Sequence, residues 1–225
     1  MTSPASIYAA TRDQLVGDMR TLDPDQAATK IESCPEWSAK DVVAHLAGLV
    51  ADLLAGVKPP LGTDEMTARQ VSERSDMSTA EICDEWTANG PGIEAFFADR
   101  ELYALGLTAD LAVHVHDLAE QIEAIAPPPA DATMAGCQRY VPLLQERVAE
   151  RLDVALTVTL DGQVWEPTAG TTELALAATP TDFLRSVTGR RTRAQVEALA
   201  WEGDASAVLD DAFTQYGPYR VASDS

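Results

Sequence analysis

The sequence is short of basic residues: 16 lysines and arginines stand against 36 aspartates and glutamates, which gives a formal net charge of −20. A surface of that charge repels nucleic-acid phosphates and anionic lipid headgroups, so we predict that neither nucleic acid nor a membrane is a partner. The simplest consequence of the charge is solubility.

Cysteines are also few. Cys34, Cys83 and Cys137 lie far apart, are odd in number and form no C-x-x-C motif. This spacing argues against a disulfide scaffold and against a thiolate zinc knuckle. We expect three free, buried thiols. Cys34, which precedes Pro35 in a predicted loop, is the only one with an interest for chemistry.

Long apolar runs are missing as well. The chain contains no uninterrupted run of about 18 apolar residues, and it does not open on a basic segment followed by an apolar one. We therefore predict a cytoplasmic protein.

Periodicity divides the chain into a helical first part and a mixed second part. The run of one alanine and three prolines at 126–129 is the clearest boundary. Beyond it, apolar and polar residues alternate, and Asp161 and Gly162 predict a hairpin turn. The sequence therefore predicts an α+β protein, with a four-helix bundle at 1–126 and a small α+β domain with an antiparallel sheet at 130–225. We expect helices at 6–22, 39–56, 78–97 (interrupted at 89–92), 105–125 and 134–151, a polar helix through 69–71, a linker at 58–62, and strands at 154–160, 163–165 and 172–178.

The predicted helix at 105–125 carries two of the three histidines. Asp110 and His114 lie one helical turn apart on its apolar stripe and point inward together. His116 lies about 160° from His114 around the helix, so the two histidines cannot face one ligand. An ionisable pair on an apolar face costs several kcal/mol unless it is compensated, and a metal ion is a common compensator.

The predicted helix at 39–56 carries the third histidine, His45. Ser38 and Asp41 fit a capping box at its start, and His45 lies at the edge of the apolar stripe near Gly48, which leaves room for close approach. Two imidazoles and one carboxylate can hold a divalent ion and leave positions open, so His45, Asp110 and His114 are candidate metal ligands. The alternatives are a satisfied core pair of Asp110 and His114 and a hydrogen-bonded boundary histidine at position 45.

Two segments resemble a known family. SCPEWSAKDVVAHLAG at 33–48 and DLAVHVHDL at 110–118 are similar to the two signatures of the mycothiol-dependent maleylpyruvate isomerase family, whose bundle is of the DinB type. The resemblance implies that His45, Asp110 and His114 bind zinc; Asp110 stands where the family motif has the longer glutamate. Asp117 matches the motif's second acid, for which we weigh a role in orienting a ligand against a solvated position on the helix. We expect Trp37 and Trp165 to be core residues.

The resemblance continues beyond the proline run. FLRSVTGRR at 183–191 and WEGD at 201–204 are similar to the family's carboxy-terminal portion, which is of the sterol-carrier type. The family's substrate implies a clamp for a carboxylate, and Arg190 or Arg191 is the candidate catalytic residue for it across the domain crevice. A surface arginine behind a helix end is the alternative.

The resemblance implies a metal-dependent enzyme that uses mycothiol on an electrophilic small molecule, by cis–trans isomerisation or by transfer of the thiol. Zinc or another divalent metal and mycothiol are the implied cofactors, and a homodimer is compatible with this type of bundle. The alternative is a binding module of the same fold that holds a metal or a small ligand without catalysis. A zinc-binding anti-sigma regulator would need an H-x-x-x-C-x-x-C motif, which the sequence lacks.

Overall fold

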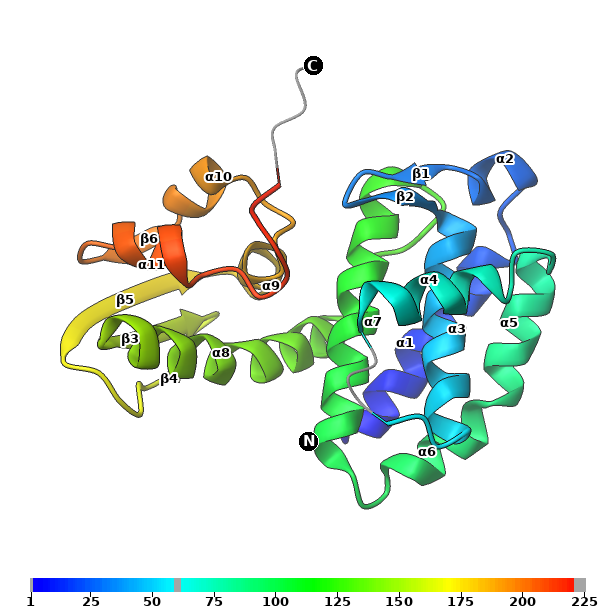
Figure 1. Ribbon diagram of the computed structural model, residues 1–225, viewed down its shortest axis with the longest axis horizontal. Helices are drawn as coiled ribbons and strands as arrows, with labels where there is room; N and C mark the ends of the chain where they lie inside the picture. The colour runs from blue at the N-terminus through cyan, green and yellow to red at the C-terminus, as the bar shows by residue number, and fades with distance from the viewer. Residues whose placement is uncertain (1, 59–61, 221–225) are drawn as a thin grey trace. The chain divides into compact units, whose positions relative to one another are not determined.

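The computed structural model describes residues 2–58 and 62–220, and most of the linker expected at 58–62 lies outside these ranges. The chain divides into two units, Met1–Ala132 and Thr133–Ser225 (Figure 1). The first is helical and the second combines helices with a sheet, so the predicted α+β class is confirmed. No described helix is long and apolar enough to span a membrane.

Helices build most of the first unit, and the longest of those packed there are α1 (Pro4–Met19), α3 (Ala39–Leu54) and α7 (Glu101–Gln121). Helix α1 packs along α7, and α3 packs against α4, α5, α6 and α7. Helix α4 crosses α3 (Figure 1), and Gln70 of α4 lies within hydrogen-bond distance of His45 on α3. The apolar side chains between these helices form one buried cluster. The helices are α1 (Pro4–Met19), α2 (Pro24–Ala27), α3 (Ala39–Leu54), α4 (Asp64–Ser72), α5 (Thr79–Ala88), α6 (Gly90–Phe97) and α7 (Glu101–Gln121).

A two-stranded hairpin precedes α3 where the sequence predicted only a loop. Strand β1 (Lys30–Ile31) pairs antiparallel with β2 (Cys34–Ser38). Strand β2 runs directly into α3 through Ser38, whose hydroxyl accepts a hydrogen bond from the backbone N–H of Asp41, while Asp41 accepts from the Ser38 N–H. This capping box, predicted from the sequence, fixes the direction in which β2 meets α3. It thereby places the side chains of β2 next to the first two turns of the helix.

The second unit holds a four-stranded sheet with the order β4-β3-β5-β6. Strands β3 and β4 form the predicted antiparallel hairpin around Asp161 and Gly162, which have φ angles of 48° and 83°. Strand β5, however, pairs parallel with β3, so the sheet is mixed rather than wholly antiparallel. The elements are α8 (Ala130–Leu152), β3 (Val154–Leu160), β4 (Gln163–Trp165), β5 (Thr172–Ala178), α9 (Pro180–Val187), α10 (Arg193–Glu197), β6 (Ala200–Glu202) and α11 (Ser206–Asp211).

The parallel pairing follows from the connection between β4 and β5. This connection returns to the start of β3, where the backbone N–H groups of Thr171 and Thr172 donate to the carbonyl of Asp153. Gly170, with a φ of 101°, passes so close to Val154 that a Cβ atom there would lie 2.3 Å from the Val154 backbone. Alternation of apolar residues predicts a strand but not its direction, so the sequence could not show this crossover.

Glycine at position 48 allows α4 to approach α3. A Cβ atom on Gly48 would lie 2.7 Å from Cβ of Gln70 on α4 and 2.8 Å from a guanidinium nitrogen of Arg74. A Cβ atom on Gly106, in the interior of α7, would meet nothing within 4 Å. The two glycines therefore differ in what an added methyl group would do, although both lie in helices.

We expect Gly48→Ala to lower the free energy of unfolding by about 1–3 kcal/mol, because the methyl group overpacks the α3–α4 contact. Gly106→Ala is the matched control and should raise it by about 0.5–1 kcal/mol, because alanine favours the helix and no neighbour has to move. Urea unfolding of both variants measures the difference. Equal stabilisation by the two substitutions would contradict the close approach at Gly48.

Candidate metal centre

Helices α3 and α7 bring three predicted ligands together in the first unit. His45 projects from α3, and Asp110 and His114 project from successive turns of α7. The Nε2 atom of His45 lies 3.5 Å from Oδ2 of Asp110, and the Nε2 atom of His114 lies 3.8 Å from Oδ1 of the same carboxylate. Both imidazoles are buried, with side-chain exposures of 5% and 7%, whereas the Asp110 side chain is 33% exposed. The two imidazoles are therefore shielded from solvent, and so is the Asp110 oxygen Oδ2 that faces His45, whereas the rest of the Asp110 side chain reaches the surface.

The ring of His45 is held from behind by a chain of hydrogen bonds. Its Nδ1 atom lies 2.8 Å from Oε1 of Gln70, and Nε2 of Gln70 donates to Asp52 at 2.6 Å. Arg69 donates to both oxygens of the same Asp52 carboxylate, at 2.8 and 2.7 Å. Because Asp52 can only accept, it orients the Gln70 amide so that its oxygen faces His45. His45 then carries its proton on Nδ1 and presents the lone pair of Nε2 to Asp110 and His114.

His114 is surrounded by acidic groups. Its Nδ1 atom lies 3.5 Å from Oδ2 of Asp117, whose side chain is 0% exposed, which excludes the solvated position weighed from the sequence. Burial lowers the pKa of His114, but its interactions with Asp117 and Cys34 and the charge of Asp110 outweigh burial and raise the pKa to about 10. The surroundings of this ring therefore favour a positive charge, which a proton or a metal ion can supply.

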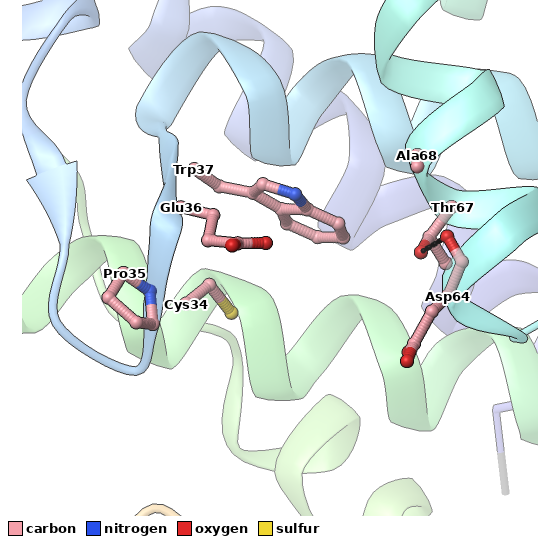
Figure 2. A pocket seen from close by; sticks show the side chains of 7 residues that line it. All are labelled: Cys34, Pro35, Glu36, Trp37, Asp64, Thr67 and Ala68. Atoms are coloured by element: carbon pink, nitrogen blue, oxygen red, sulfur yellow. Dashed lines mark hydrogen bonds between the residues drawn. The ribbon is translucent and has the colours of Figure 1, made fainter.

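Trp37 covers the cluster from the side of β2. Its ring centroid lies 5.1 Å from that of His45 and 6.1 Å from that of His114. It is half-buried and lines a surface recess of about 190 Å³ together with residues of β2 and α4 (Figure 2). Trp37 therefore contacts both histidines and also lines a recess at the surface. The sequence predicted it only as a core residue. The recess is lined by Cys34, Pro35, Glu36, Trp37, Asp64, Thr67 and Ala68.

The geometry of the three ligands fits a divalent ion. The carboxylate–imidazole distances of 3.5 and 3.8 Å are longer than a usual N–H···O hydrogen bond of about 2.7–3.2 Å. They approach the separation of about 3.3 Å between two ligand atoms that each lie about 2.0–2.1 Å from a tetrahedral ion. The shorter side chain of Asp110 therefore still reaches both histidines. In the described part of the chain, two groups bring their ligand atoms within 4.8 Å of one another: His45 with Asp110 and His114, and Cys34 with His114 and Asp117.

Other predicted residues lie elsewhere. His116, on another face of α7, belongs to neither group of ligands found among the described residues. Arg190 and Arg191 follow α9 in the second unit, where Arg190 donates to the carbonyl of Thr188 at 2.8 Å. Both are half-buried, and their role in clamping a substrate stays a prediction. Gln70 was not identified from the sequence as a partner of His45. The only signal was the glycine at position 48, which leaves room for close approach but does not identify the neighbour.

The chain is similar to a known protein family and to solved structures. The family model described as the mycothiol maleylpyruvate isomerase N-terminal domain matches residues 8–136. A crystal structure of a mutant of the mycothiol-dependent maleylpyruvate isomerase aligns with a TM-score of 0.60 at 9% identity, covering 90% of this chain and 96% of that one. A second crystal structure of the mycothiol-dependent maleylpyruvate isomerase aligns with a TM-score of 0.55 at 10% identity, covering 84% of this chain and 92% of that one. No curated protein sequence matches the chain.

We expect Asp52 to stabilise the fold in a pH-dependent way. Burial raises the pKa of Asp52, but hydrogen bonds from Arg69 and Gln70 outweigh burial and lower it. A carboxylate with a lowered pKa in the folded state stabilises the protein above its unfolded pKa and loses that contribution as the pH falls through the folded value. Asp52→Asn should therefore lower the free energy of unfolding at pH 7, and the difference from the native chain should shrink below about pH 4.

Urea unfolding at both pH values measures this difference. Asp99→Asn, at an exposed position, is the control and should leave the free energy of unfolding close to that of the native chain at both. An effect of Asp52→Asn that is equally large at pH 7 and at low pH would contradict the charge-based contribution.

Proposed function

Because the chain belongs to the mycothiol maleylpyruvate isomerase family, we propose that it is a metal-dependent enzyme that uses mycothiol to act on an electrophilic small molecule. The observation that carries the proposal is the cluster of His45, Asp110 and His114, whose ligand atoms all lie within 4.8 Å of one another. Three donors from two helices match a reactive metal site, which keeps a coordination position open, better than a closed structural site, which uses four.

His45, Asp110 and His114 would hold the ion, which we propose to be Zn²⁺. A bound zinc ion with an open position supplies Lewis-acid stabilisation of a thiolate at neutral pH. Gln70 and Asp117 face the second nitrogen of each imidazole and keep the rings oriented, as partners behind metal-bound histidines do. Both histidines thereby direct their Nε2 atoms to the side on which Asp110 lies.

The reaction is either cis–trans isomerisation by addition and elimination of the thiol, or transfer of the thiol to the electrophile. In both cases the chain must bind the thiol beside the cluster and limit the access of water. Trp37 serves the second purpose, because its indole covers His45 and His114 next to the recess. Arg190 and Arg191 remain the candidates for binding a substrate carboxylate. A binding module without catalysis is the alternative, and thiol-dependent turnover separates the two.

We expect the purified chain to contain about one zinc ion, measured by elemental analysis after purification without added metal. His114→Ala should lose it, because the variant leaves only two donors. His116→Ala is the matched control, since it removes the same side chain from another face of α7 and should retain the ion. A native chain that stays free of metal even after reconstitution with excess zinc would show that Asp110 and His114 are only a structural pair.

We expect thiol-dependent turnover of an electrophile to disappear in His45→Ala. Loss of one of three ligands empties the site, so the rate should fall by at least about 100-fold, toward the uncatalysed reaction of the free thiol. Turnover is followed by consumption of the electrophile with mycothiol present and absent, and Cys83→Ser, a buried position in α5, is the control. Zinc bound by the native chain without any turnover to lose would favour the binding module.

A further inference from the structure

A second group of ligand atoms meets at the other nitrogen of His114. It consists of the sulfur of Cys34, Nδ1 of His114 and a carboxylate oxygen of Asp117, and these atoms lie within 4.8 Å of one another. The first group uses Nε2 of the same ring, which faces Asp110. A thiolate, an imidazole and a carboxylate are the three kinds of side chain that bind Zn²⁺ in proteins. The second group is therefore a set of three metal donors in its own right.

Within this group, Nδ1 of His114 is a buried polar atom that lacks a hydrogen bond. His114 is 6% exposed, and among the described residues no side chain or backbone group makes a hydrogen bond with Nδ1. Oδ2 of Asp117 lies 3.5 Å from it, beyond the usual N–H···O range of about 2.7–3.2 Å. Two atoms bound to one tetrahedral ion at about 2.0–2.1 Å lie about 3.3 Å apart, which is close to this separation. The nitrogen and the carboxylate are thus spaced for a shared cation rather than for a direct hydrogen bond.

The local structure holds the three donors together. His114 and Asp117 are three residues apart on α7 and so project on the same side of the helix, and the Asp117 side chain is 0% exposed. Cys34 begins β2, whose partner strand β1 packs against α7. The capping box of Ser38 joins the other end of β2 to α3. The sulfur is therefore placed by a hairpin that is anchored on both helices of the first group.

A divalent cation can approach this group through the recess beside Trp37. Cys34 is half-buried and lines the recess, and in Figure 2 its sulfur points into that space. Glu36 and Asp64 add two carboxylates, and none of the described residues that line the recess is a lysine or arginine, so its charge attracts cations. Among these lining residues, only Cys34 belongs to either group of metal donors. An ion that enters by the recess therefore meets the second group before the first.

We propose that Cys34, His114 and Asp117 form a second position for a divalent cation, alternative to the position at His45 and Asp110. A neutral imidazole has a single lone pair, so His114 serves one position at a time. When the second position is filled, Nδ1 of His114 binds the ion, Nε2 keeps its proton and faces Asp110, and the proton of the Cys34 thiol passes to solvent. The thiolate and the Asp117 carboxylate then balance the charge of the ion. Binding here requires neither catalysis nor an ion at His45, so it stands apart from the proposed function.

The test uses Co²⁺, because a thiolate ligand gives bound Co²⁺ an intense charge-transfer absorption in the near ultraviolet, and nitrogen and oxygen ligands do not. The metal-free His45→Ala chain, kept reduced with a phosphine, is titrated with Co²⁺ and followed by absorption, and the bound ion is counted by equilibrium dialysis. His45→Ala disables the first position, so we expect about one Co²⁺ per chain with the thiolate band. No bound Co²⁺, or bound Co²⁺ without the band, would overturn the proposal.

Further variants, each made in the His45→Ala chain, identify the ligands. Cys34→Ser should remove the band and weaken the binding of Co²⁺ at least about tenfold, and Asp117→Asn should weaken it to a similar extent. Cys83→Ser is the matched control, since it removes a buried thiol of α5 and should keep both the band and the affinity. A band that persists without Cys34 would contradict the assignment of the sulfur ligand.

The native chain separates this proposal from the proposed function. One bound Co²⁺ without the thiolate band is expected there, because the ion lies at His45, Asp110 and His114. One bound Co²⁺ that shows the band would support the second position and reject the first. Two ions bound at once would overturn the proposal that His114 serves one position at a time.

Discussion

Compensation of buried charge is the constraint on which the first unit depends. The side chain of Asp117 is fully buried and that of Asp52 is 9% exposed, and Asp110 faces two buried imidazoles. Each carboxylate has a cationic or polar neighbour on another turn or another helix, namely Arg69 for Asp52 and His114 for Asp110 and Asp117. Among these groups, the contact of Asp52 with Arg69 joins α3 to α4, and the contact of His45 with Asp110 joins α3 to α7. The geometry of the site is therefore a consequence of how the unit satisfies its own charges.

Patterns within a few residues of the sequence predict the helices correctly. The features that these patterns miss depend on pairing between distant parts of the chain. The box formed by Ser38 and Asp41 marks the start of α3, and the alternation along β3 marks that strand, because both signals lie within a few residues. The hairpin of β1 and β2 has neither a strong alternation nor a glycine turn. The parallel direction of β5 depends on a crossover to Asp153, which no local pattern encodes. The family resemblance read from the two signatures is confirmed by the match over residues 8–136.

Site residues whose placement depends on one helix were predicted, and those whose placement depends on contacts between elements were missed. The spacing of Asp110 and His114 is a property of one helix, so their common orientation follows from the sequence. The partnership of His45 with Gln70 depends on how α4 crosses α3, and a glutamine in a polar helix looks like any other surface residue. Trp37 was assigned to the core because an indole is mostly apolar, whereas its position at the end of a strand beside a recess requires the hairpin.

The two imidazoles of the cluster are held by acceptors of different charge, and this difference bears on reactivity. Gln70 fixes the tautomer of His45 without adding charge, whereas Asp117 also makes His114 a more basic ligand. Asp110 and Asp117 together supply two negative charges, which the proposed divalent ion would balance. A thiolate added to that balanced set would bring an excess negative charge and would be held less firmly than in a site with neutral ligands alone. If the proposed metal is bound there, such a set would favour release of the thiolate to an electrophile over a thiolate that stays bound as a permanent ligand.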